Sequence, residues 1–437
     1  MSEQDSVRPD TLQRPIDDKE AWKAYWEQQG QPWRSEPEID AERQSYLSMR
    51  RKIPPDIERG SYPFKDIKLD RADVEWLLAT HENKRGPVDW SDESQRKRMG
   101  LDLRAANLSK TNLTSLPLAR LYAGLTKEER SPEDVDRQQR NIAAAHLEGT
   151  NLRGAHLEGA YLARTHMEDA NLENTYLEES DLSGAHLEGA TLRKAHLEGA
   201  YLSRAFFSIA SNLNYIILSN KKLGCVSVDN VNWNGVNLGL VEWGDVDILG
   251  DERRAREKKT RSGQIKKYET RFKEYVKAVR ANRKLAVALQ SEGLNEEASH
   301  FFYRAQVLQR KVVYMQMQQQ GITIRRKSNL LGAFLLSGFL SILSGYGYRL
   351  GRAFLSYSFV IVVFAIAYSI LGHLSLWPPD AFVYSMTSFH GRGFFPGFGN
   401  GLPLHHPLIM LAAFEALVGL IIEVTLIVTL TQRFFRK

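Results

Sequence analysis

The apolar residues between Leu103 and Phe207 recur every five positions, a spacing that neither an α-helix nor a β-strand produces. Two places before each large apolar residue the chain carries Ala, Thr or Ser, as at Ala145 and Thr150. A fixed short period predicts a repeat architecture, which has to be recognised before any other element is assigned. The central residues of the unbroken run are Leu147, Leu152, Leu157, Leu162, Met167, Leu172, Leu177, Leu182, Leu187, Leu192, Leu197, Leu202 and Phe207.

This pattern resembles the pentapeptide-repeat family over roughly residues 101–250. The resemblance implies a right-handed quadrilateral β-helix with four pentapeptides per coil, in which the large and the small residue of each unit point into a narrow tube. Coils are expected to stack at the strand spacing of about 4.8 Å. A charged insertion at about residues 128–140 interrupts the period, and the weaker units after Phe207 are expected to cap the tube, as repeat rods require.

Two segments without this period flank the repeats. Residues 1–100 hold several tryptophans among many charges and are expected to form an N-terminal cap, disordered at its start and then mostly helical. Residues 251–322 contain two stretches with apolar residues at helical spacing, separated by Gly293, and predict a helical hairpin that acts as a connector. No motif in either segment carries recognisable chemistry.

The last hundred residues are mostly apolar. Residues 353–372 are uncharged and residues 408–430 are apolar apart from two glutamates, so each run is long enough to span about 30 Å of hydrocarbon as a helix. A third run begins at Asn329, and the positive-inside rule places all the flanking basic residues on one side only if this run does not cross. Residues 323–352 are therefore assigned to an interfacial helix, with both termini cytosolic and the spans in the cell inner (plasma) membrane.

A short segment between the two spans begins at Pro378 and Asp380, which are typical of a helix start, and meets glycines too soon to cross. A span, a re-entrant helix, a glycine turn and a second span resemble, in layout, the potassium-channel pore domain over residues 353–437. The resemblance implies a homotetramer that encloses the path of a permeant ion. The filter or pore loop is then expected at Thr387, Ser388, Phe389, His390, Gly391, Arg392 and Gly393.

Arg392 stands where that family carries an aromatic residue between two glycines, so the permeant ion stays open. Four arginines facing the lumen would favour anions, whereas an arginine that points backward could pair with a carboxylate and leave carbonyls lining the path. Glu415, Gly419 and Glu423 share one face of the second span. Intramembrane charges face a bundle interior, an aqueous cavity or a partner. Glu415 and Glu423 are predicted to line the pore or pair with Arg392, with Gly419 as a gating hinge. Alternatively, the three residues determine how the subunits pack, with Gly419 permitting close helix contact.

Composition narrows the function further. The formal net charge of the 437 residues is +6, which is modest for this length, and no nucleic-acid partner is expected. The single cysteine, Cys225, excludes an internal disulfide and a cysteine-based metal site. No phosphate-binding loop, dinucleotide fingerprint, zincin motif or nucleophile elbow is present, so we expect no enzyme, no catalytic residue and no cofactor.

Histidines recur one place before the central apolar residue, and residues twenty apart would stack. His146, His166 and His186 are therefore expected to form a column with the strand spacing. Metal binding, pH sensing and simple copying of one sequence unit on a solvated face all remain open, and no metal site is predicted. A column of glutamates, one place after the central residue, is expected to face outward. The basic run from residue 253 to 284 could meet anionic lipid headgroups or be a solvated helix face.

These segments predict a multidomain chain with a right-handed quadrilateral pentapeptide β-helix, a helical hairpin and an all-α membrane pore domain of two transmembrane helices and a re-entrant pore helix. The first hypothesis is a homotetrameric ion channel, surrounded by membrane lipids, whose cytosolic repeats regulate the pore through a partner that the sequence does not identify. The second is a non-conducting, membrane-anchored scaffold or sensor that uses the β-helix as a binding surface. The re-entrant segment favours the channel, because an anchor does not need one.

Overall fold

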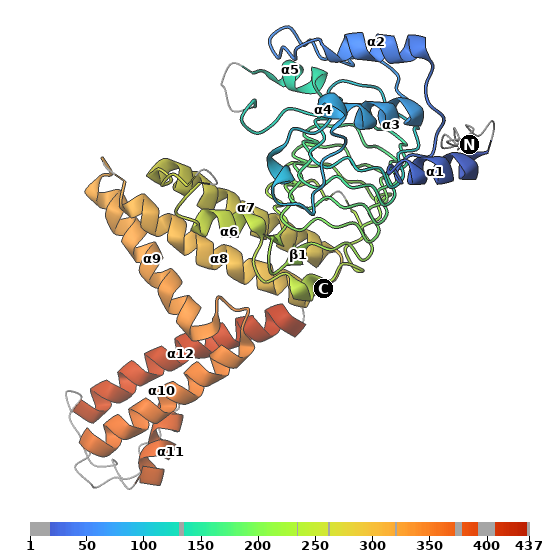
Figure 1. Ribbon diagram of the computed structural model, residues 1–437. Helices are drawn as coiled ribbons and strands as arrows, with labels where there is room; N and C mark the ends of the chain where they lie inside the picture. The colour runs from blue at the N-terminus through green and yellow to red at the C-terminus, as the bar shows by residue number, and fades with distance from the viewer. Residues whose placement is uncertain are drawn as a thin grey trace, which may run out of the picture. The chain divides into compact units, whose positions relative to one another are not determined.

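The computed structural model describes residues 18–130, 135–233, 235–260, 263–319, 321–371, 378–391 and 407–434. The chain divides into two compact units, Met1–Glu257 and Lys258–Lys437, which are taken in turn. Figure 1 shows that coils without long strands dominate the first unit and that the second unit consists of helices.

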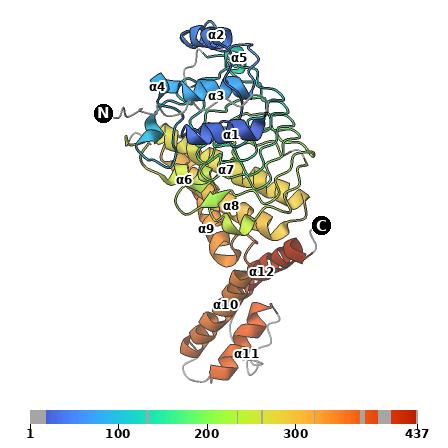
Figure 2. The same cartoon turned by 45° about the vertical axis from the view of Figure 1, so that its right-hand side comes forward.

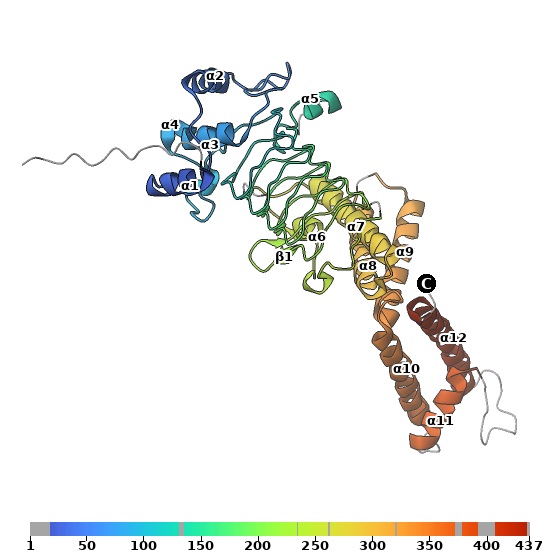
Figure 3. The ribbon, with the colours of Figure 1, turned by 90° about the vertical axis from the view of Figure 1, so that its right-hand side faces the viewer.

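The coils of the first unit are joined by parallel bridges between residues twenty apart. One column runs from His146 to His166, His186 and Phe206, and three further columns rise beside it. Backbone hydrogen bonds connect successive coils: Leu147 N donates to His166 O at 2.7 Å, and His166 N donates to Ala145 O at 3.1 Å. Figure 3 shows the coils stacked one on another. Each coil thus contains four pentapeptides, which confirms the β-helix expected from the resemblance to the pentapeptide-repeat family.

The interior of the tube contains the central residue and the small residue of each unit. Leu172, Leu177 and Leu182 are fully buried, and so are the small polar residues of the same run. Their hydroxyls are satisfied by the backbone, since Thr175 Oγ1 donates to Leu152 O at 2.9 Å. Buried hydroxyls that are hydrogen-bonded avoid the cost of an unpaired polar group. The alternation of Leu with Ala, Thr or Ser therefore fills the tube without orphaned donors.

The ladder extends beyond the run with a visible period. Lys68 pairs in parallel with Asn107, and Leu69 N donates to Asn107 O at 2.9 Å, so the segment before residue 101 already contributes a coil edge. The charged insertion leaves the ladder intact, because Asn107 pairs directly with His146 across it. Within the insertion, α5 (Arg137–Ile142) begins at a capping box formed by Asp136 and Gln139.

Short helices precede the coils within residues 18–100, and the start of the chain, expected to be disordered, lies outside the described residues. Asp18, Asp40 and Asp70 accept backbone hydrogen bonds at the starts of α1, α2 and α3. The fully buried Glu75 of α3 accepts from Ser35 N at 2.9 Å and from Arg71 Nε at 2.7 Å. Figure 2 shows these helices beside the coils. The elements are α1 (Lys19–Gln28), α2 (Ala41–Arg51), α3 (Arg71–Ala79), α4 (His81–Lys84) and η1 (Gln95–Lys97).

The far end of the tube is closed by a hairpin and a short helix. β1 (Ser219–Asn220) pairs antiparallel with β2 (Gly224–Cys225), and η2 (Trp243–Asp245) follows. α6 (Gly250–Arg256) begins against this end, where Val228 N donates to the buried Asp251 carboxylate at 2.7 Å. The cap expected after Phe207 is therefore built from irregular coil, a hairpin and one helix.

The second unit contains six helices within the described residues. α7 (Tyr268–Ser291) and α8 (Asn295–Met317) form the expected hairpin, which turns at Gly293 with a positive φ of 81°. α9 (Ile324–Ser344), α10 (Leu350–Leu371), α11 (Pro378–Phe389) and α12 (Pro407–Phe434) follow. Three of these are long and apolar enough to cross a membrane: Ile324–Ser344, Gly351–Leu371 and Pro407–Val428. The helix Ile324–Ser344 comes from the run assigned to the membrane surface, and that assignment stays a prediction.

Candidate functional site

The short helix α11 packs between the two long apolar helices α10 and α12. Tyr368 of α10, Ala381 and Tyr384 of α11, and Leu408 and Ala412 of α12 form one buried cluster. With 12 residues, α11 is about 18 Å long, well short of a membrane crossing. A helix of this length between two spans is the arrangement expected for a re-entrant helix.

Glu415 connects the three helices. Its side chain is fully buried, Tyr368 of α10 donates its hydroxyl to one carboxylate oxygen at 2.6 Å, and the hydroxyl of Ser385 in α11 contacts the other. A carboxylate inside an apolar bundle is costly unless donors surround it, and these two hydroxyls supply part of that compensation. Glu415 therefore fixes α11 against both neighbours. Tyr368 and Ser385 were not singled out in the sequence, because only the fold brings them to Glu415.

A second polar group lies at the C-terminal end of α11. His390 Nδ1 contacts the carboxylate of Glu423 in α12, and His390 Nε2 lies 2.9 Å from the Tyr357 hydroxyl of α10. The next residue, Gly391, has a positive φ of 64°, and its N–H donates to Ser388 O at 2.9 Å. The chain therefore leaves α11 toward the expected filter at His390, which contacts both α12 and α10.

Gly419 of α12 lies against the last residue of α11. A Cβ atom at this position would meet the carbonyl oxygen of Phe389 at 2.1 Å and its carbonyl carbon at 2.9 Å. Phe389 itself is buried, with 1% of its surface exposed. Such proximity to backbone favours the interpretation in which Gly419 permits close helix contact. The hinge role stays a prediction.

The remaining residues of the expected filter fall into two groups. Thr387 donates its hydroxyl to Tyr384 O at 2.9 Å within α11, and Ser388 is buried. Arg392 and Gly393 lie outside the described residues. Glu415, Gly419 and Glu423 of α12 are thus brought against α11 or the residue after it, whereas the direction of Arg392 stays a prediction in both of its forms.

Polar side chains also line two opposite faces of the β-helix. His146, His166 and His186 stack with ring centroids 5.0 Å apart at each step, as the column expected from the sequence requires. On the opposite side of the four-sided coil, His156 and His196 lie on either face of Tyr176, with centroid distances of 4.6 Å and 5.0 Å. Two aromatic columns therefore run along the tube.

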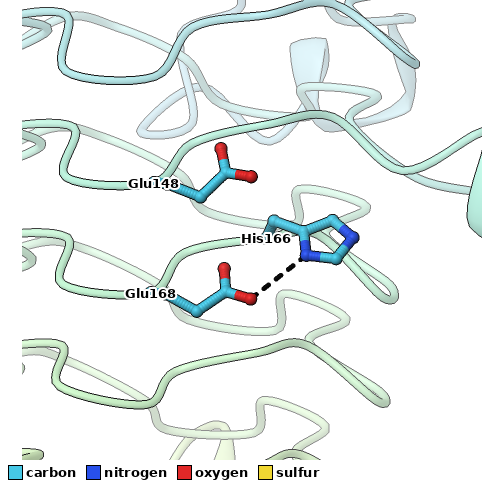
Figure 4. A group of neighbouring side chains, drawn as sticks. All are labelled: Glu148, His166 and Glu168. Atoms are coloured by element: carbon cyan, nitrogen blue, oxygen red, sulfur yellow. Dashed lines mark hydrogen bonds and ion pairs between the residues drawn. The ribbon is translucent and has the colours of Figure 1, made fainter.

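Each histidine faces the glutamate two residues later in the same coil. The Nδ1 to Oε1 distances are 2.7 Å at His146–Glu148, 2.9 Å at His156–Glu158, 3.1 Å at His166–Glu168, 3.4 Å at His186–Glu188 and 3.6 Å at His196–Glu198. Figure 4 shows how His166 and Glu168 lie beside Glu148 of the preceding coil. The arrangement is a ladder of imidazole–carboxylate pairs, which we call the His–Glu ladder.

Two glutamates of the His–Glu ladder are more buried than an outward column predicts, whereas Glu148, Glu168 and Glu188 keep about a third of their side chains exposed. Glu158 and Glu198 keep only 6% and 5% of their surface exposed. Burial raises the pKa of Glu178 to about 7, and the carboxylates of Glu158 and Glu198 add to this rise. The hydrogen bond to Glu158 raises the pKa of His156, and the nearby Glu198 carboxylate does the same for His196. A single repeat unit does not reveal this burial.

Comparison with known proteins identifies the repeats. The profile of the family described as pentapeptide repeats matches residues 141–178 and 170–208. Among solved structures, a pentapeptide repeat protein from the cyanobacterium Cyanothece 51142 is 26% identical over 29% of this chain and 88% of its own, with a TM-score of 0.12.

Two further solved structures are similar over the same kind of region. A pentapeptide repeat protein of the Arabidopsis thaliana thylakoid lumen is 19% identical over 38% of this chain and 83% of its own, with a TM-score of 0.17. The plasmid-mediated fluoroquinolone resistance protein QnrB1 is 13% identical over 35% of this chain and 79% of its own, with a TM-score of 0.15. No curated protein matches the chain. Residues 141–208 are therefore a pentapeptide-repeat region, and it is followed in the chain by three helices long and apolar enough to cross a membrane.

Proposed function

We propose that the chain is the subunit of a homotetrameric ion channel of the pore-loop type, in which α10 and α12 span the membrane and α11 is the pore helix. The observation that carries the proposal is the packing of α11. This helix is too short to cross a membrane and is linked to both spans through the buried Glu415. The pentapeptide repeats would be a cytosolic regulatory domain, and the membrane would be the cell's inner (plasma) membrane with both termini on the cytosolic side.

A simple membrane anchor would not need the polar contacts that α11 makes. Ionisable groups at membrane depth are costly, and here Glu415, Glu423 and His390 all serve to hold one short helix and the residue after it. Backbone that is not helical is tolerated at membrane depth only where it is buried in protein or lines a water-filled path. The left-handed Gly391 begins such backbone. A two-span subunit encloses a path only by assembly with further copies, which is why we propose a tetramer.

The ion that passes depends on Arg392 in this proposal. Glu415 is held by Tyr368 and Ser385, and Glu423 is held by His390, so each of the two carboxylates of α12 already has a partner within its own subunit. This favours an orientation in which the guanidinium of Arg392 faces the ion path, and such a positive charge would make the channel prefer anions. A backward-pointing Arg392 would have to compete for one of these carboxylates and would leave a cation path lined by carbonyls.

A second candidate is a non-conducting, membrane-anchored scaffold or sensor. It is favoured by the family match, which falls on the repeats, and by the polar His–Glu ladder along their surface. In that case the β-helix is the functional surface and the apolar helices only attach it to the membrane.

Planar-bilayer recording of the purified chain under a KCl gradient separates these functions. We expect single-channel openings whose reversal potential lies toward that of chloride and moves toward that of potassium in Arg392→Ala. Ser369→Ala is the matched control, because this hydroxyl of α10 donates only within its own helix, to Ala365 O at 3.1 Å, and it should leave the reversal potential unchanged. A monodisperse tetramer that gives no openings would overturn the channel and support the scaffold.

A further inference from the structure

Three places in the His–Glu ladder share one arrangement, in which the imidazole–carboxylate pair of one coil lies above a glutamate of the coil before. The ligand atoms of each set lie within 4.8 Å of one another. Figure 4 draws the first of them, and its dashed line joins His166 to Glu168 while Glu148 reaches in from the preceding coil. The sets are Glu148, His166 and Glu168; Glu168, His186 and Glu188; and Glu178, His196 and Glu198.

The last set, which we call the upper triad, has carboxylates that the protein satisfies only in part. Glu198 is 95% buried, and its Oε1 lies 3.6 Å from His196 Nδ1 and 3.3 Å from Asn220 Nδ2. Its Oε2 is buried and has no hydrogen-bond partner among the described residues, as is true of the Oε2 of Glu178 and of each glutamate of the ladder, and the burial of Glu198 distinguishes this triad from the other two sets. A buried acceptor without a donor is unfavourable. These oxygens therefore point to a ligand that the chain itself does not supply.

The charges around the upper triad indicate the sign of that ligand. Glu158, Glu178 and Glu198 occupy the same position in three successive coils, about 4.8 Å apart, where like charges repel. Within the described parts of the chain their ion pairs are with histidines alone, and the contact between coils, His196 Nδ1 to Glu178 Oε1, is 4.0 Å long. A cation between the carboxylates would relieve this repulsion.

We propose that Glu178, His196 and Glu198 bind a divalent transition-metal ion of the zinc class. One imidazole nitrogen and two carboxylate oxygens are ligands that zinc accepts, with water in the fourth position. Magnesium and calcium prefer a shell made only of oxygens, so the imidazole selects against them. Tetrahedral ligands about 2.0 Å from an ion are about 3.3 Å apart, and small side-chain rotations bring atoms within 4.8 Å to that separation.

The ladder contains its own control for this proposal. His156 and Glu158 form the same pair in one coil, with Nδ1 and Oε1 2.9 Å apart. His156 pairs with Pro117 of the preceding coil, so the position beneath Glu158 is Ala119, which offers no ligand. A histidine pair without a carboxylate below it should not hold the ion.

The test counts bound metal in the full chain, purified in detergent and stripped with a chelator. We expect the native chain to bind zinc at micromolar concentration after desalting, His196→Gln to bind one equivalent less, and His156→Gln to bind as much as the native chain. Substitution of cobalt should give the visible absorption of a tetrahedral ion, reduced in His196→Gln and unchanged in His156→Gln. Glu198→Gln is a second variant, and it should weaken the same site at least tenfold.

The reactivity of Cys225 reports whether each variant is folded, because this thiol is buried near the end of the tube. A native chain that binds no zinc, or folded His196→Gln and Glu198→Gln variants that keep the full stoichiometry, would overturn the proposal. Loss of the same equivalent in His156→Gln would also overturn it, because that result assigns the ion to histidine pairs in general rather than to the upper triad.

Discussion

The pentapeptide β-helix and the apolar helices α10 to α12 obtain their structure in opposite ways. In the β-helix, each coil bonds to the coils before and after it, and every fifth residue fills the tube, so that the same contacts recur along its length. In the helices, backbone hydrogen bonds are satisfied within each helix. Which helix faces which then depends on a few side chains, such as Glu415 and Gly419.

This difference predicts where each region is sensitive. A core leucine of the β-helix is one of many equivalent residues, but its loss leaves a cavity in a tube too narrow to collapse. A substitution in the helices matters only where it falls on one of the few contacts that orient them. Apolar residues elsewhere on α10 and α12 are exposed, as Leu355 and Ile427 are, and are suited to lipid or to further subunits.

The largest effect is expected from Leu182→Ala, in the middle of the tube. Leu182 is fully buried, and truncation of a buried leucine costs about 2 to 5 kcal/mol of the free energy of unfolding. Urea titration, with labelling of the Cys225 thiol as the reporter of β-helix unfolding, measures the change. Ser183→Ala is the control from the same coil, and it should alter the free energy by less than about 0.5 kcal/mol. Equal effects of the two substitutions would contradict the tube as the source of stability.

A smaller effect is expected from Gly419→Ala in α12. The added methyl group meets the backbone of Phe389 and cannot be accommodated by rotation of a side chain, so overpacking should cost roughly 1 to 3 kcal/mol. The midpoint of thermal unfolding in detergent should fall accordingly. Gly338→Ala in α9 is the matched control, because nothing lies within 4 Å of its Cβ position. If both variants unfold at the native temperature, α11 does not depend on the close approach at Gly419.

Much of the β-helix could be predicted from the sequence because the period of five directly determines which residues face the interior of the tube. The period indicated the buried leucines, and the four units per coil implied by the resemblance to the pentapeptide-repeat family indicated the histidine column. Two features lay beyond it. The coil edge at Lys68 carries no period that marks it, and its place depends on pairing with Asn107. The burial of Glu158 and Glu198 is not shared by the equivalent Glu148, Glu168 and Glu188, so no single repeat unit reveals it.

The apolar helices were predictable as elements but not as an arrangement. Length and composition indicated the long helices and the short α11, since hydrophobic runs determine these directly. The sequence also placed Glu415, Gly419 and Glu423 on one face of α12. Their partners Tyr368, Ser385 and His390 come from other helices, and the choice among many possible neighbours is made only by tertiary packing. Histidine, serine and tyrosine inside apolar segments are the signal that could have suggested them.

The smallest expected effect tests whether the His–Glu ladder contributes to stability through charge. The hydrogen bond from His156 to Glu158 raises the pKa of His156, with further contributions from the carboxylates of Glu178 and Asp89. The native state therefore holds this proton more tightly than the unfolded state does. The stabilisation is complete below the unfolded value of about 6.5 and is lost as the pH rises through the higher folded value. Because the imidazole is half exposed, we expect less than about 1 kcal/mol.

Urea titrations of the chelator-treated chain between pH 6 and 8, again with Cys225 as reporter, measure this contribution as a difference between variants at each pH. His156→Gln should be less stable than the native chain at pH 6 and approach it at pH 8, so that its stability changes less with pH. Glu158→Gln should reduce the pH dependence in the same way, because it removes the acceptor that holds the proton, and combining the two substitutions should add little. A pH dependence that survives in both variants would assign it to other groups and leave the ladder's imidazole–carboxylate pairs without an electrostatic role in folding.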